Sequence, residues 1–89
     1  MGEVAVTFRI MPDDASVDLA HLKDEVVKRA DSLGRLVGVE EQPIAFGLKA
    51  LMLRIVIEDA EGALDRIEKR ISEIPEVQSI EAVEMGRLL

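Results

Sequence analysis

Two segments of this 89-residue chain repeat one pattern, in which a strand-like run is followed by a helix-like run and a second strand-like run. The first segment opens at Glu3–Met11, where apolar residues alternate with polar or small ones, as in a strand with one buried face. Apolar residues at helical spacing follow Asp18, whose carboxylate can cap the first turn, and Gly34 is placed to end that helix in the left-handed conformation. Arg35–Gln42 then predicts a weaker strand, which Gly38 interrupts.

The second segment begins with the most apolar strand of the chain, Leu51–Ile57, which carries apolar residues on both faces. Such a strand is typical of the centre of a sheet. The stretch Asp59–Ile74 has an apolar residue every three or four positions, which predicts a helix that Pro75 ends. Val77–Arg87 predicts the last strand, and its imperfect alternation around Ile80–Val83 favours an edge strand or a bulge.

The fold class predicted by this order is α+β, a ferredoxin-like βαββαβ sandwich. It has a four-stranded antiparallel sheet with two helices on one face, and right-handed crossovers put the first and third strands in the middle. Residues 1–89 are expected to form a single domain. No helix is expected on the other face of the sheet, which is therefore predicted to be open to solvent or to a partner, with some apolar side chains exposed. Its expected members are Ala5, Thr7, Arg9, Ala50, Met52, Arg54 and Val56.

Composition argues against several classes of function. The net charge of −7 disfavours contact with nucleic-acid phosphates, and no apolar stretch is long enough to span a membrane. Cysteine is absent, which removes disulfides, zinc–thiolate sites and a cysteine nucleophile. The lone histidine, His21, and the scattered acidic residues match no catalytic or metal-binding motif. We therefore expect a cytoplasmic protein that is not a conventional enzyme and needs no cofactor.

Two segments are explained less well by a purely structural role. In the predicted loop Gln42–Gly47, Phe46 is one of only two aromatic residues of the chain and precedes a flexible glycine. It is either an anchor for a partner or a plug at the end of the core. Residues 84–89 place Arg87 and two leucines at the end of an acidic chain. They either complete the core or present a guanidinium to an anionic or metal-bearing site on another molecule.

The same two segments resemble the motifs of a known family. Pro43–Leu51 reads PIAFGLKAL and resembles the P-I-x-F-G-[IL]-x-x-L signature of the elongation factor 1-beta family. Val77–Ser79, followed by Met85–Leu88, resembles the V-Q-S and M-x-[KR]-L motifs at the end of that family's chains. The length is similar to that of the archaeal members, which consist of the exchange domain alone. The resemblance therefore covers essentially the whole chain.

The resemblance implies a guanine-nucleotide exchange factor that promotes GDP release and GTP loading on the translation GTPase elongation factor 1-alpha, without bond chemistry of its own. In the family's eukaryotic members a penultimate lysine enters the magnesium site of the GTPase, and Arg87 stands at that position here. The family's loop phenylalanine, which contacts the partner near the nucleotide site, corresponds to Phe46. This chain departs from the pattern in having arginine for lysine and one further residue, Leu89, at its end. The implied partner-binding residues are Phe46, Gly47, Met85, Arg87 and Leu88.

Two other functions remain open for the predicted fold. A ferredoxin-like regulatory module would bind a small molecule such as an amino acid at a dimer interface, and ligand-dependent dimerisation would identify it. The turn after the first strand, Pro12-Asp13-Asp14, has no glycine-rich sequence suited to that role. A metal chaperone of the same fold is disfavoured by the absence of cysteine.

Overall fold

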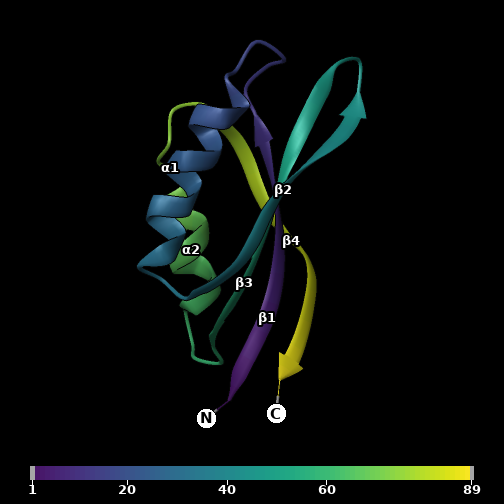
Figure 1. The fold of residues 1–89 in the computed structure, drawn as a ribbon. Helices are drawn as coiled ribbons and strands as arrows, with labels where there is room; N and C mark the ends of the chain where they lie inside the picture. The colour runs from purple at the N-terminus through teal and green to yellow at the C-terminus, as the bar shows by residue number, and fades with distance from the viewer. Residues whose placement is uncertain (1, 89) are drawn as a thin grey trace.

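The chain folds into a four-stranded sheet with both helices on one face (Figure 1). The computed structural model describes residues 2–88, and the side chains of residues 2–86. This arrangement confirms the predicted α+β, ferredoxin-like fold. The elements in chain order are β1 (Glu3–Pro12), α1 (Leu19–Asp31), β2 (Arg35–Ala45), β3 (Leu48–Glu58), α2 (Ala63–Ser72) and β4 (Val77–Leu88).

The strand order also follows the prediction. The sheet runs β2-β3-β1-β4 with every neighbouring pair antiparallel, so β1 and β3 are central and the other two strands form the edges. β1 and β3 pair without interruption from Glu3 opposite Glu58 to Ile10 opposite Leu51. The edge strands are less regular, and the irregularity predicted for the last strand is confirmed as a bulge at Val83. Residues of the edge strands without a partner on the neighbouring strand are Val37, Ile44, Gln78 and Val83.

The core lies between the sheet and the helix layer. Alternate residues of β1 point into it, as the period-two pattern predicts, and each helix contributes an apolar stripe. Burying one such side chain contributes about 1.5–3 kcal/mol, so this layer supplies most of the stability. The residues that β1 and the helices contribute to this hydrophobic core are Val4, Val6, Phe8, Ile10, Leu22, Val26, Ala30, Ala63, Ile67 and Ile71.

α1 begins where the sequence predicts. The Asp18 carboxylate accepts hydrogen bonds from the backbone N–H groups of Ala20 and His21, at 3.0 and 3.3 Å. It thereby satisfies two of the amides that the first turn leaves without a partner.

The predicted end of α1 is wrong. The helix stops at Asp31, and Gly34 does not adopt the left-handed conformation. Glycine is required there for space, because a Cβ on Gly34 would lie 2.7 Å from the carbonyl oxygen of Val56 and 2.8 Å from Cγ2 of Ile57. The connection between α1 and β2 therefore crosses β3 in direct contact with its backbone.

The second helix is shorter than predicted. The sequence indicates a helix over Asp59–Ile74, whereas α2 spans Ala63–Ser72. Gly62 precedes it with a φ of 81°, in the left-handed region, and a right-handed helix cannot continue through that conformation. Residues 60–63 form a turn instead, in which the N–H of Ala63 donates to the carbonyl of Ala60.

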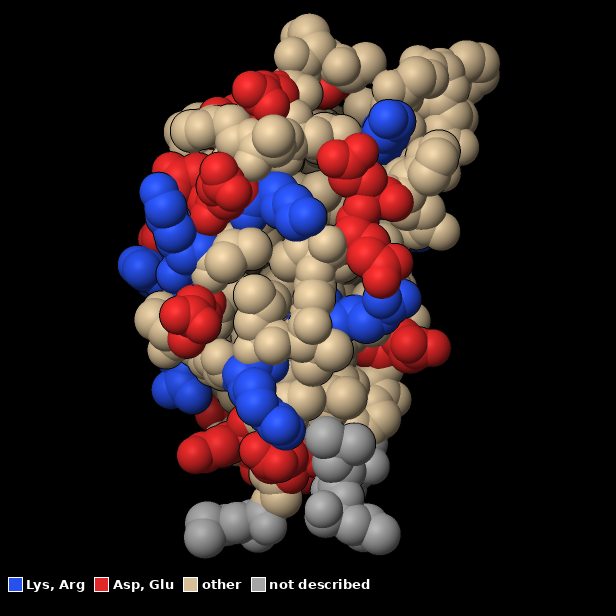
Figure 2. Space-filling model, in the orientation of Figure 1, with Lys and Arg blue, Asp and Glu red and all other residues tan. Residues whose placement is uncertain are grey.

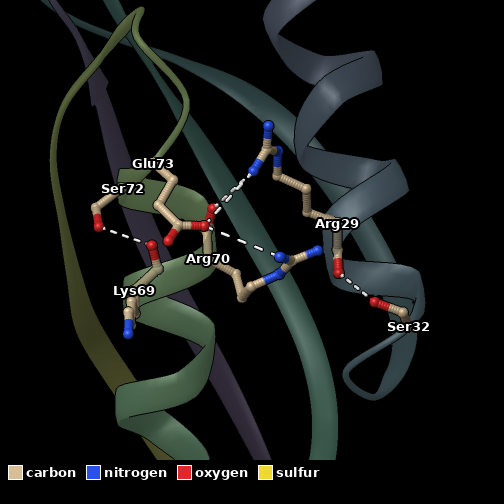
Figure 3. A network of polar contacts seen from close by, with 6 residues as sticks. All are labelled: Arg29, Ser32, Lys69, Arg70, Ser72 and Glu73. Atoms are coloured by element: carbon tan, nitrogen blue, oxygen red, sulfur yellow. Dashed lines mark hydrogen bonds and ion pairs between the residues drawn. The ribbon is translucent and has the colours of Figure 1, made fainter.

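A polar contact joins the two helices near the end of α2 (Figure 3). The Arg29 guanidinium donates a 3.3 Å hydrogen bond to the backbone carbonyl of Arg70. The Glu73 carboxylate lies 3.9 Å from a guanidinium nitrogen of each arginine. Because these side chains are partly exposed, each ion pair contributes less than about 1 kcal/mol. The contact therefore adds little to the stability of the fold.

The hairpin of β2 and β3 extends past the helices (Figure 1). The sequence predicts a loop over Gln42–Gly47, but β2 continues through Pro43 to Ala45, which pairs with Leu48. Proline is compatible with this position because β2 is an edge strand and needs no hydrogen bond on its outer side. The connecting loop is therefore only two residues long, Phe46 and Gly47.

Candidate partner-docking site

The turn of the hairpin holds Phe46 in a conformation that phenylalanine rarely adopts. The φ angles of Phe46 and Gly47 are 53° and 78°, both in the left-handed region. A two-residue turn with two positive φ angles is of type I′, which favours Asn-Gly or Gly-Gly. A left-handed conformation costs a residue with a Cβ about 1–2 kcal/mol. Phenylalanine is therefore a strained choice, and such strain concentrates at functional sites.

Phe46 is also fully exposed, with a relative accessibility of 103%. The interpretation of this side chain as a plug for the core is therefore wrong. Residues 42–48 carry no charge, and they form the uncharged lobe at the upper right of Figure 2. An exposed aromatic ring on an uncharged protrusion is suited to insertion into an apolar pocket of another protein.

Backbone bulges expose most of the other large apolar side chains. Five large apolar side chains are exposed among the described residues, and three of them belong to residues without a strand partner. A bulge turns its extra residue away from the core, which explains the exposure of these three. Broken alternation indicates the bulge at Val83, whereas those at Val37 and Ile44 escape sequence analysis because they depend on the pairing with β3. The five are Val37, Ile44, Phe46, Val83 and Met85.

The C-terminal segment forms the end of β4 beside the start of β1. Met85 lies opposite Val6 and is 55% exposed. The backbone of Arg87 pairs with Val4, and that of Leu88 pairs with Glu3. The side chains of Arg87 and Leu88, and the whole of Leu89, lie outside the described residues.

The predicted site residues therefore fall into two groups at opposite ends of the sheet. Phe46 and Gly47 lie at the hairpin tip, whereas Met85, Arg87 and Leu88 follow one another on β4 near the chain termini (Figure 1). Ile57, which aligns with Val4 and Arg87, lies nine positions along β3 from Leu48, beside the tip. At about 3.3 Å per residue, the two groups are about 30 Å apart.

The helix-free face of the sheet joins these two ends, and fewer of its apolar side chains are exposed than predicted. Ala50 and Val56, expected to be exposed there, are 0% and 6% accessible. Two ion pairs cross it: Arg9 with Glu81, and Arg54 with Glu40 at 2.9 Å. Each of these arginines is therefore paired with a glutamate of a neighbouring strand.

Over the residues that the structure describes, no three histidine, aspartate or glutamate side chains converge as a metal site would require. In the same part of the chain, neither helix is long and apolar enough to cross a membrane.

Comparison with known sequences supports the motif resemblance. The profile of the family described as the EF-1 guanine nucleotide exchange domain matches residues 5–88. A protein of Methanothermobacter thermautotrophicus named Elongation factor 1-beta is 40% identical over 89 residues, which cover 100% of both chains. The Elongation factor 1-beta of Methanococcoides burtonii is 39% identical over 87 residues, which cover 98% of each chain.

Among solved structures, the chain resembles the C-terminal domain of the MgtC protein from Mycobacterium tuberculosis. The TM-score is 0.63 at 16% sequence identity, over 98% of this chain and 88% of that one. Identity this low supports the fold alone.

Proposed function

This chain belongs to the EF-1 guanine nucleotide exchange domain family, and from this we propose how its two ends act on the GTPase elongation factor 1-alpha. The chain is a nucleotide exchange factor for that GTPase and performs no bond chemistry of its own. We propose that residues 1–89 act as one exchange domain, which binds the GDP-loaded GTPase and promotes GDP release and GTP loading. The acidic net charge of −7 supports docking on the protein rather than on bound nucleic acid.

The C-terminal end is the element that we assign to the nucleotide site. Arg87 would place a positive charge near the magnesium ion and the phosphates that hold GDP. A cation there competes with magnesium for the surrounding oxygens, whatever the exact fit of a planar guanidinium. The position of this residue at the open end of an edge strand, beside the exposed Met85, supports such an insertion.

Phe46 is the second contact, and the separation of about 30 Å requires that it engages a different part of the GTPase. We therefore revise the expectation that both contacts act at the nucleotide site. In the proposal Phe46 anchors the complex on an apolar pocket far from the phosphates, while the C-terminal end perturbs the nucleotide site. Its full exposure is the observation that carries this assignment.

Exchange then follows from coupling between binding sites. A factor that binds the emptied GTPase more tightly than the GDP-bound form weakens GDP binding by the same factor, because the coupling is reciprocal. The preference has to come from contacts that differ between the two forms. The cation of Arg87 can occupy its place only after magnesium leaves, whereas the Phe46 contact is available in both forms.

This assignment is tested by following the release of fluorescent GDP from purified elongation factor 1-alpha, with excess unlabelled GTP and saturating exchange factor. Arg87→Ala, or deletion of residues 87–89, should lower the maximal rate at least about tenfold, which corresponds to about 1.4 kcal/mol. Arg87→Lys keeps the charge and should retain most of the rate. Full activity of the deletion variant would rule out the C-terminal mechanism, provided that its circular dichroism spectrum matches that of the wild type.

A further inference from the structure

Met85 has the most exposed methionine side chain that the structure describes. The chain has no cysteine, so its four methionines hold all of its sulfur, and Met1 lies outside the described residues. Met85 is 55% accessible, whereas Met11 and Met52 are only partly exposed. Oxidation of a methionine depends on access of the oxidant to its sulfur. Of the described methionines, Met85 is therefore the one that a dissolved oxidant reaches most easily.

The exposure of Met85 follows from its place at the end of the helix layer. β4 continues past α2 toward the C-terminus (Figure 1). Met85 lies opposite the core residue Val6, so it faces the helix side of the sheet where no helix covers it fully. A cleft of about 60 Å³ opens beside it, lined also by Val4, Ile57 and Leu64. A water-sized molecule needs about 10–15 Å³ of such space, so a peroxide molecule fits next to this side chain.

Oxidation would change the chemistry of this position. Hydrogen peroxide transfers one oxygen atom to the thioether sulfur, so an S–O bond forms, the O–O bond of the peroxide breaks, and water is released. The sulfur loses two electrons and the peroxide gains them. The product, methionine sulfoxide, is polar and accepts hydrogen bonds, whereas the thioether is a flexible apolar group. The cleft beside Met85 leaves room for the added oxygen, so we expect the fold to persist.

The position of Met85 connects this chemistry with nucleotide exchange. Met85 precedes Arg87 by two residues on β4, in the segment that we assign to the nucleotide site of the GTPase. The apolar side chain is exposed in the free chain and would be covered in the complex. Covering a sulfoxide without a hydrogen-bond partner carries a desolvation penalty that the thioether does not have. The oxidised chain should therefore engage the GTPase less well.

We propose that Met85 is an oxidation site through which peroxide reversibly lowers the exchange activity of this chain. The effect on exchange rests on the proposed function, whereas the reactivity of Met85 does not. Methionine sulfoxide reductases return the sulfoxide to the thioether, so the loss of activity should be reversible.

Peptide mapping by mass spectrometry tests the reactivity. The purified chain is treated with hydrogen peroxide over a time course, and the sulfoxide fraction is measured at Met11, Met52 and Met85. Met85 should be oxidised at least about threefold faster than either of the other two. Oxidation of Met85 at the same rate as Met11 or Met52, or more slowly, overturns the proposal.

An exchange assay tests the effect on function. The peroxide is removed before the chain is mixed with elongation factor 1-alpha loaded with fluorescent GDP, so that only the exchange factor is oxidised. The GDP release rate of each treated protein, at subsaturating concentration, is divided by the rate of the same protein without treatment. This ratio should fall to about one-fifth or less in the wild type and in a Met11→Leu/Met52→Leu double variant, and methionine sulfoxide reductase should restore it. In Met85→Leu the ratio should stay close to one.

Three results of this assay overturn the proposal: an unchanged ratio in the wild type, an equal fall in Met85→Leu, or a loss that the reductase does not reverse. The melting temperature of the oxidised wild type should stay within about 3 °C of the untreated value, and a larger fall would mean that oxidation acts by unfolding the chain. Failure of the untreated chain to release GDP overturns the proposed function and the effect on exchange with it. The order of the oxidation rates does not depend on that outcome.

Discussion

Phe46 combines an unfavourable backbone conformation with complete exposure, so nothing within the described part of the chain compensates for its strain. A residue selected for stability at this position would be asparagine or glycine, which tolerate the left-handed region. The presence of phenylalanine is therefore most simply explained by contact with another molecule. The two-residue turn places the ring at the tip of the hairpin, and a turn this short limits the backbone entropy lost on docking.

Phe46→Asn separates the two roles of this position. Removing the strain should raise the free energy of unfolding by about 1 kcal/mol, measured by chemical denaturation. The same change should weaken binding to elongation factor 1-alpha by about 1–3 kcal/mol, as should Phe46→Ala, measured by calorimetry. A variant that loses stability and keeps its affinity would return Phe46 to a structural role.

For helices and strands, the regular spacing of apolar residues predicts the features that depend on local sequence alone. Features that depend on pairing between strands or on turn conformation are not predicted in this way. The alternation of β1, the apolar stripe of α1 and its cap at Asp18 are all confirmed, because each depends on local spacing. β2 is longer than predicted because an edge strand can include Pro43. α2 is shorter than predicted because the chain forms a turn at Gly62, and the spacing of apolar residues does not reveal that turn. At the candidate site, the motif predicts Phe46, but its exposure depends on the length of the hairpin.

The connection between α1 and β2 provides a stability test. Gly34→Ala should lower the free energy of unfolding by about 1–3 kcal/mol, because its Cβ would overlap the Val56 carbonyl. Gly38→Ala, where the space is open, should change it by less than about 0.5 kcal/mol. Gly34→Asn distinguishes the cause, since asparagine suits a left-handed helix end and does not fit a close contact. Equal stability of Gly34→Asn and the wild type would contradict the contact account.

At the scale of the whole molecule, the hairpin tip and the C-terminal end lie about 30 Å apart, so their contacts with the GTPase should act independently. Phe46→Ala should raise the concentration of exchange factor needed for half-maximal GDP release and leave the maximal rate nearly unchanged. Deletion of residues 87–89 should lower the maximal rate. The loss of activity in the double variant is measured from the rate of GDP release at subsaturating exchange factor and is expressed as a free energy. It should equal the sum of the losses in the two single variants within about 0.5 kcal/mol. Strong non-additivity would indicate that both ends engage a single site.

The bulges of the two edge strands also affect how copies of this chain meet each other. An edge with a long, regular ladder invites a second chain to extend the sheet, which is how fibrils begin. β2 and β4 each break register twice, so an incoming strand would find only short stretches of matching donors and acceptors. The irregularities that turn Val37 and Val83 outward thereby also protect a crowded or heated solution of this protein from sheet-to-sheet aggregation.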